Sequence, residues 1–190
     1  MSIFKSIALT SLLTVGLSFA VINANAAGSG SSGSDTPAAS PKKLKCKKGE
    51  VIKTVTKNGK KVKVCVKPVA GLISDDELYD QGRLLAKEGE YDWALSVLAL
   101  VSNQNDPKVL NYTGYSHRKA GRLETGITYY RKALALNPNF VLAREYLGEG
   151  YVAAGRVDLA MIELGEIKTR CGITCVEYKD LSAAIASATN

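Results

Sequence analysis

Three pairs of glycines recur along the second half of the chain, and their spacing limits the fold more than any other feature. The pairs are Gly82 and Gly89, Gly114 and Gly121, and Gly148 and Gly155. The members of a pair lie seven residues apart, and successive pairs begin 32 and then 34 residues apart. A period of this length indicates similar supersecondary units that bury their apolar faces by stacking on one another. The chain is therefore expected to be a repeat protein rather than one irregular domain.

Other positions repeat in the same register. In each repeat, an apolar residue lies two positions after the second glycine and a small residue lies five positions after it. A bulky residue lies four positions after that small residue. In that order they are Tyr91, Leu123 and Val157; Ala94, Gly126 and Ala160; and Leu98, Tyr130 and Leu164. We expect two helices to approach closely at the small residues. All six glycines are expected to lie within helices, so they predict no phosphate-binding loop.

The pattern from Ser74 to about Gly172, with the segment Tyr129–Pro138 closing the middle unit, resembles the tetratricopeptide repeat. The resemblance implies an all-α fold of three helix-turn-helix units at about 75–106, 107–140 and 141–172, within residues 74–172. A capping helix over 173–190 is expected to seal the open end of the stack. The sequence departs from the family in the first unit, which is two residues short, and in the third, which lacks the terminal proline.

Residues at the expected helix starts agree with this register. Ser74 followed by Glu77 predicts a capping box. Asp106 before Pro107 predicts a side-chain N-cap with proline in the first turn. Apolar residues between Val176 and Ser187 recur as in a final helix.

A small β-hairpin is predicted ahead of the repeats, within residues 42–68. Residues 50–57 and 60–66 are rich in β-branched side chains and flank Asn58-Gly59, a pair that favours a two-residue turn. Such a turn pairs Val51 with Val66 and places five valines on one face. An isolated hairpin is marginally stable in water, so a disulfide between Cys46 and Cys65 would have an evident role.

The four cysteines fall into two local pairs, Cys46 with Cys65 and Cys171 with Cys175. Three connectivities are possible, and short separations favour this one. The spacing of Cys171 and Cys175 fits neither a redox motif nor haem attachment. A structural disulfide is the favoured interpretation there, and reactive or metal-binding thiols are the alternative.

Residues 1–26 are predicted to be a secretory signal peptide. Lys5 precedes an apolar run from Ile7 to Ile22, and Ala24-Asn25-Ala26 supplies small residues for cleavage. A membrane anchor is the alternative, but the run is shorter than the roughly 20 residues of a bilayer span. Residues 27–41, rich in Gly, Ser, Ala and Pro, are expected to be a disordered linker. The leader resembles those of Gram-negative envelope proteins, which implies a periplasmic location, with an extracellular one as the alternative.

Positive charge is concentrated in one segment. Residues 42–67 hold eleven lysines and one acid, whereas residues 68–190 hold thirteen basic and sixteen acidic residues. The lysine-rich hairpin could bind an anionic envelope polymer. It contains no aromatic residue for base stacking, so sequence-specific nucleic-acid binding is not expected. Alternatively, its lysines only protect an exposed strand edge from aggregation.

The resemblance implies that the first helix of each repeat lines a concave groove that binds a peptide or protein partner. The partner-binding positions are Tyr79, Arg83, Lys87, Lys108, Asn111, Tyr115, Arg118, Lys119, Glu145 and Glu149. The Asn/Lys/Arg set with which chaperone-binding members hold a terminal carboxylate is not reproduced. A partner segment with some acidic character is expected, and ordinary solvated side chains are the alternative.

No set of residues predicts catalysis. His117 is the only histidine, and it occupies a packing position of the middle repeat. With this one histidine in a packing position, there is no His–Cys–Asp set to assemble as a nucleophilic triad. We predict no enzyme activity, no cofactor and no metal site, and a protein that acts by binding.

Overall fold

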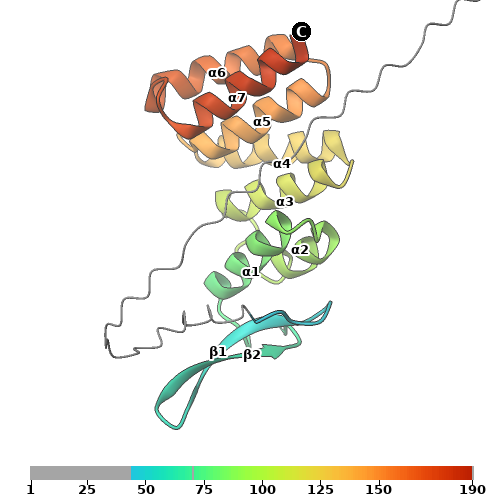
Figure 1. Ribbon diagram of the computed structural model, residues 1–190, viewed down its shortest axis with the longest axis vertical. Coiled ribbons are helices and arrows are strands. Elements are labelled where there is room, and N and C mark those ends of the chain that lie inside the picture. Colours follow the sequence, from blue (N-terminus) through green and yellow to red (C-terminus); the bar gives the residue numbers. More distant parts are fainter. Residues whose placement is uncertain (1–43, 70, 190) are drawn as a thin grey trace, which may run out of the picture. The chain divides into compact units, whose positions relative to one another are not determined.

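The computed structural model describes residues 44–69 and 71–189, which belong to one compact unit of residues 42–190. The predicted leader and linker lie outside the described residues. The described elements follow one another along the chain as a two-stranded hairpin and seven helices (Figure 1). They are β1 (Val51–Lys57), β2 (Lys60–Val66), α1 (Asp75–Lys87), α2 (Tyr91–Leu98), α3 (Pro107–Lys119), α4 (Leu123–Leu136), α5 (Val141–Ala153), α6 (Val157–Cys171) and α7 (Val176–Thr189).

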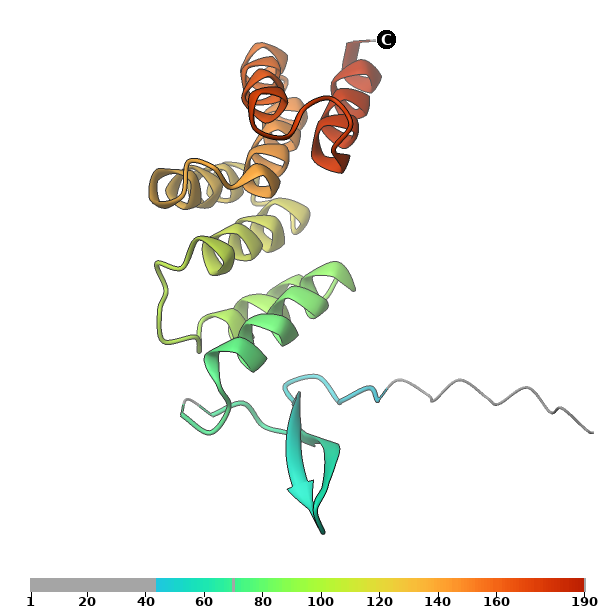
Figure 2. The same cartoon turned by 90° about the vertical axis from the view of Figure 1, so that its left-hand side faces the viewer.

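The helices form three consecutive pairs, α1 with α2, α3 with α4 and α5 with α6, and α7 packs on both helices of the third pair. Figures 1 and 2 show the pairs stacked in chain order above the hairpin. The first helices also contact one another in sequence, α1 with α3, α3 with α5 and α5 with α7. The predicted all-α stack with a capping helix and a preceding hairpin is confirmed.

The two helices of the middle pair approach each other backbone to backbone. A Cβ atom at Gly126 would lie 2.8 Å from the carbonyl oxygen of Gly114. A side chain at either glycine would therefore push α3 and α4 apart. The bulky residue expected four positions beyond Gly126 is Tyr130, which is fully buried between the helices. Close approach and a large buried ring together explain the small–bulky alternation in the sequence.

The two glycines of each pair have different roles. Gly82, Gly114 and Gly148 lie inside α1, α3 and α5. Gly121, by contrast, lies in the turn after α3 with φ of 83°, and Gly89 and Gly155 occupy the matching turns with φ of 87° and 71°. The expectation that all six lie within helices is thus wrong for the second member of each pair. A backbone with positive φ is disfavoured for residues with a Cβ, so these turns require glycine.

The hairpin has the predicted register, with Val51 opposite Val66 and Lys57 opposite Lys60 around the turn. Val51 is 1% exposed and joins the core of the first repeat. The strand is further attached to α1, because the Ile52 amide donates to Oε1 of Gln81 at 3.4 Å. Cys46 is disulfide-bonded to Cys65. The hairpin is therefore an extension of the first repeat rather than a separate element.

The helix starts agree with the sequence. Ser74 and Glu77 form the reciprocal capping box of α1. The Asp106 side chain accepts a hydrogen bond from the Lys108 amide, and Pro107 is the first residue of α3. Within the described residues, no helix is both long enough and apolar enough to cross a membrane.

Candidate functional site

Four tyrosines from the first helices of the three repeats form a continuous cluster, which we call the tyrosine cluster: Tyr79 on α1, Tyr112 and Tyr115 on α3, and Tyr146 on α5. The ring centroids of Tyr79 and Tyr112 are 6.0 Å apart and those of Tyr115 and Tyr146 are 5.1 Å apart. Tyr112 also contacts the rings of Tyr115 and Tyr146. Tyr112 and Tyr146 are buried, whereas Tyr79 and Tyr115 are half-buried. A partner could thus reach ring surface on α1 and α3.

Burial raises the pKa of Tyr79 to about 12, and the neighbouring Tyr112 adds to the effect. Burial also raises the pKa of Tyr115 and, more strongly, that of Tyr146. The phenols of Tyr79, Tyr115 and Tyr146 are therefore neutral throughout the physiological range. They can donate a hydrogen bond and offer the negative face of a ring to a cation.

Three cationic side chains surround the Tyr115 ring. Lys87 Nζ lies 4.6 Å from its centroid, and Arg118 Cζ and Lys119 Nζ each lie 5.8 Å away. Lys87 reaches this place from α1 and donates a hydrogen bond of 2.5 Å to the hydroxyl of Tyr146. Burial lowers the pKa of Lys87, while the carboxylates of Glu145 and Glu149 oppose that effect.

Arg118 is held more firmly than the two lysines. Its guanidinium forms an ion pair with Glu149 and its Nε donates to the hydroxyl of Tyr130 at 3.2 Å. The Arg118 side chain is only 8% exposed. Because both partners are fixed on packed helices, Arg118 acts as part of the floor of the site.

Acidic side chains lie beside the cluster on α5 and α7. Glu145 is 5% exposed, and within the described residues its carboxylate has neither a hydrogen-bond donor nor a basic group within 4.0 Å. Burial, followed by the negative charges of Glu149, Asp180 and Glu177, raises the pKa of Glu145 to about 8. The cluster therefore borders on a region of negative potential.

At the other end of the face, Tyr79 and Lys108 line a small cavity between α1 and α3 together with Asp76 and Asp106. Arg83 is largely exposed and lies 3.6 Å from Asp80. This end presents Tyr79, Arg83 and Lys108 to solvent without the dense packing seen around Tyr115.

The predicted partner-binding residues thus divide into two groups and one residue that stands apart. Lys87, Tyr115, Arg118, Lys119, Glu145 and Glu149 come together around the tyrosine cluster; Tyr79, Arg83 and Lys108 lie toward α1. Asn111 belongs to neither group, because its side chain is fully buried and neither Nδ2 nor Oδ1 has a partner among the described residues.

Four residues of this face were absent from the predicted set: Tyr112, Tyr146, Glu177 and Asp180. The first two occupy equivalent positions 34 residues apart, which was a visible signal of a shared role. The two acids lie on α7, and the sequence pattern described that helix only as a cap. Its packing against α5 is what brings its carboxylates near Glu145.

His117 lies in the packing environment expected of it. Its ring stacks on Tyr129 with centroids 5.4 Å apart, and Nδ1 accepts a hydrogen bond from Arg122. Burial and the positive charge of Arg122 lower its pKa.

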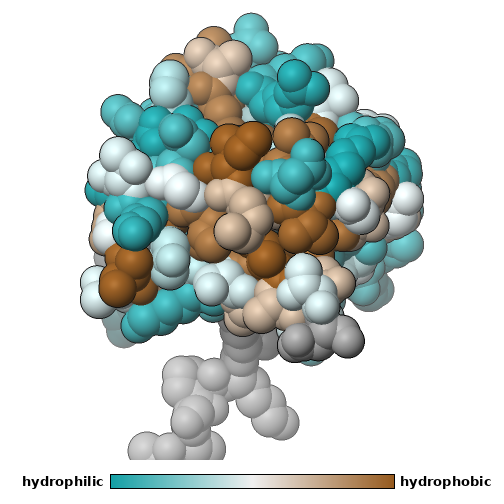
Figure 3. All heavy atoms as spheres, turned by 90° about the horizontal axis from the view of Figure 1, so that it is seen from above, coloured by the Kyte–Doolittle hydropathy of each residue, from teal (hydrophilic) through white to brown (hydrophobic). Residues whose placement is uncertain are grey.

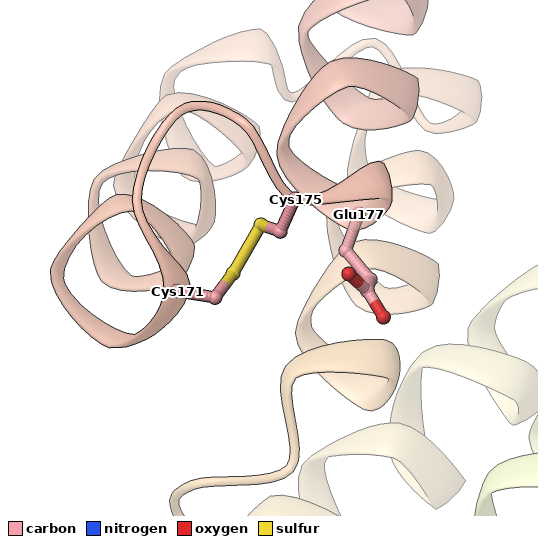
Figure 4. A group of neighbouring side chains, drawn as sticks. All are labelled: Cys171, Cys175 and Glu177. Carbon is pink, nitrogen blue, oxygen red and sulfur yellow. A yellow bond between two sulfur atoms is a disulfide. The ribbon is translucent and has the colours of Figure 1, made fainter.

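A second group of potential ligands lies where α6 meets α7. Cys171, Cys175 and Glu177 have their sulfur and carboxylate atoms within 4.8 Å of one another (Figure 4). The two sulfurs are joined in a disulfide. A disulfide sulfur is not a thiolate, so the oxidised pair cannot act as the ligand set of a soft metal.

The α6–α7 end of the stack also carries apolar side chains. Met161, Ile162, Ile173 and Val176 are each more than half exposed. Figure 3 views the molecule from this end and shows apolar residues in the middle of the face with hydrophilic ones around them.

Fold and site together define a helical-repeat protein whose first helices carry a mixed aromatic and charged surface. Residues 107–140 match the family model of the tetratricopeptide repeat. The middle helix pair is thus a tetratricopeptide repeat; the pairs on either side of it stack in the same arrangement, and a disulfide-linked hairpin precedes them.

Several solved structures share this fold. The crystal structure of MamA is 18% identical, with a TM-score of 0.52 over 60% of this chain and 68% of that one. The first repeat domain of Spaghetti (RPAP3), bound to an HSP90 peptide, is 16% identical, with a TM-score of 0.54 over 61% and 93%. The type III secretion translocator chaperone SycD of Yersinia enterocolitica is 20% identical, with a TM-score of 0.51 over 60% and 87%. No curated protein sequence matches the chain.

Proposed function

We propose that this protein is a non-catalytic interaction module that binds a peptide or protein segment across the face formed by α1, α3, α5 and α7. The observation that carries the proposal is the tyrosine cluster, which places partly exposed rings beside both cationic and anionic groups. Tyrosine and arginine are the residues that dominate binding energy at protein interfaces. Two proteins of the same fold support the proposal, one seen with an HSP90 peptide and one a translocator chaperone.

Charge along this face favours an extended partner with acidic and basic parts. Arg83 and Lys108 offer donors to carboxylates near α1, whereas Glu177 and Asp180 lie near α7. Complementary charges of this kind set the register and the rate of association more than the affinity. The proposal thus retains the acidic character expected of the partner and adds a basic part at the α7 end.

Site-specific crosslinking tests the proposal. A photoreactive amino acid is placed at Lys119, beside the Tyr115 ring, and in a matched variant at Lys168, which is exposed on α6. The partner should crosslink only from position 119, and purified partner should lose most of its affinity for Tyr115→Ala. Equal crosslinking from position 168, or full affinity in Tyr115→Ala, would remove the basis of the proposal.

We also infer that the protein acts outside the cytoplasm, in the periplasm or beyond it. Two disulfides are typical of an oxidising compartment, and the first 26 residues have the pattern of a cleavable leader. Mass spectrometry of the protein recovered from its natural host should find Ala27 as the first residue. An intact leader, or reduced cysteines in freshly isolated protein, would contradict this inference.

A second candidate function is binding of an anionic envelope polymer by the lysine-rich hairpin. Lys57, Lys60, Lys61 and Lys63 are all exposed on the two strands. The full-length protein with these four lysines changed to glutamine should keep partner binding under the first proposal. Under the second, it should lose polyanion binding, and the intact protein should show a steep salt dependence.

A further inference from the structure

We propose that Tyr115, Tyr146, Glu145 and Glu149 form a binding site for a lysine or arginine side chain of the partner, and that Lys87 occupies this site in the unbound protein. The inference rests on the proposed partner-binding function and specifies which part of the partner the α5–α7 end recognises.

The position of Lys87 shows that the site has the shape and chemistry to hold an ammonium ion. Lys87 Nζ lies 4.6 Å from the ring centroid of Tyr115 and 5.0 Å from that of Tyr146. A cation within about 6 Å of a ring centroid is attracted by the negative face of the ring. The same nitrogen donates to the Tyr146 hydroxyl at 2.5 Å. One ammonium group therefore satisfies two rings and a phenol at once.

The Glu145 carboxyl is an acceptor without a donor, and it independently points to a cationic ligand. Glu145 is 5% exposed. The positive charge of Lys87 lowers the pKa of Glu145, but the Lys87 nitrogen does not come within the 4.0 Å of an ion pair with its carboxylate. A carboxyl in this position ionises at a cost, because protein has replaced most of its water and no donor compensates for the loss. A cationic side chain inserted more deeply than Lys87 would supply the missing donor.

Lys87 can be displaced from the site more easily than Arg118. Lys87 is the last residue of α1, and its side chain is largely exposed. Arg118 is fixed by Glu149 and Tyr130 and is almost fully buried. A partner cation would therefore compete with Lys87, and the displaced lysine would return to solvent at little cost.

The surrounding charge favours a basic rather than an acidic occupant at this end. Glu177 and Asp180 on α7 add negative potential beside Glu145 and Glu149. Lys119 and Arg118 oppose it from α3, but the second of these is neutralised by its ion pair with Glu149. Once Lys87 is displaced, Glu177 and Asp180 still outnumber Lys119.

Titration of the intact mature protein with blocked tripeptides tests the proposal. Ala-Lys-Ala is the probe and Ala-Glu-Ala the charge-reversed control, and binding is followed by NMR shifts of the backbone amides of α5 and α7. Lys87→Met should tighten binding of the lysine peptide about tenfold, because it removes the competing ammonium. Glu145→Gln should weaken it about tenfold, because the amide keeps the shape of the side chain but cannot ionise to pair with the bound ammonium.

Matched variants make the result specific. Lys168→Met and Asp158→Asn change the same charges on α6, where both side chains are exposed, and should leave the affinity unchanged. The proposal is overturned if Lys87→Met lowers thermal stability without tightening binding, since Lys87 would then be only a packing contact. It is equally overturned if the glutamate peptide binds better than the lysine peptide. Crosslinking at Lys119 decides the proposed function separately, so a failure of the cation site can be distinguished from a failure of the proposed function.

Discussion

Lys87 and Tyr146 lie 59 residues apart in the chain, yet the lysine ammonium donates to the tyrosine hydroxyl at 2.5 Å. This contact joins the first repeat to the third across the face of the second. Neighbour-only contacts are typical of solenoids, in which each repeat touches the next one only. The contact therefore marks the place where the three repeats act as one surface.

Tyr146→Phe removes the hydroxyl that receives this hydrogen bond. We expect the free energy of unfolding to fall by about 1 kcal/mol, since the ring is buried and its packing is kept. Urea denaturation followed by circular dichroism measures the change. Tyr178→Phe on α7 is the control, because no hydrogen bond of its hydroxyl is found among the described residues, and it should cost much less. Equal losses in the two variants would mean that the Lys87 contact contributes nothing.

The raised pKa of Glu145 makes stability depend on pH. Its pKa is about 8 in the folded protein against an ordinary value of 4.5, so the folded state binds the extra proton between these values. Stability from this group is therefore full below about pH 4.5 and is lost as the pH rises to about 8. Glu145→Gln should remove the loss and gain on the order of 2 to 4 kcal/mol at pH 8.

Denaturation of both proteins from pH 5 to pH 9 measures the effect of Glu145. The charged groups that act on it are Glu149 on its own helix, Glu177 and Asp180 on α7, and Lys87 on α1. A stability advantage of the glutamine variant that does not grow with pH would contradict the assignment.

Gly126→Ala tests the close approach of α3 and α4. A Cβ there would meet the Gly114 carbonyl oxygen at 2.8 Å, and a backbone atom cannot rotate away. We expect a loss of roughly 1 to 3 kcal/mol in the free energy of unfolding. The same substitution at Gly165 on α6 meets no atom within 4 Å and should instead stabilise by about 0.5 to 1 kcal/mol. Thermal denaturation should show a lower melting temperature for Gly126→Ala and a higher one for Gly165→Ala than for the unchanged protein.

The Cys46–Cys65 disulfide should hold the hairpin rather than the repeats. Replacing both cysteines by serine opens a loop with a sequence separation of 19 and should cost about 3 kcal/mol locally in the chain-entropy model. Hydrogen exchange should then show faster exchange in β1 and β2 with unchanged protection in α3 to α7. Uniformly faster exchange in the helices would show that the hairpin supports the whole stack.

Much of the fold could be predicted because repeat proteins encode it locally. The register of the hairpin followed from the Asn58-Gly59 turn, and the start of α1 followed from Ser74 and Glu77. The role of Gly121 was misread, because a spacing of seven residues does not distinguish a helix interior from a turn just beyond its end. The positive φ that requires glycine there is visible only in the backbone.

The face of the first helices could be predicted as a set of positions, but the state of each side chain could not. Asn111 and Lys87 were both predicted to line it; Asn111 is fully buried, and Lys87 covers two tyrosines. Side-chain burial depends on how far neighbouring helices are rotated and shifted. Spacing within one helix carries no information on that.

The sequence by itself determined the repeat, its helix pairs and the hairpin register, because each depends on residues within about one repeat length. It only favoured the local pairing of the cysteines. Only the tertiary structure decided that Tyr79, Tyr112, Tyr115 and Tyr146 form one cluster. It also decided that Lys87 reaches from α1 to the hydroxyl of Tyr146 on α5. It also placed Glu177 and Asp180 beside Glu145. These relationships join residues from different repeats, and they follow from the packing angle between successive helices.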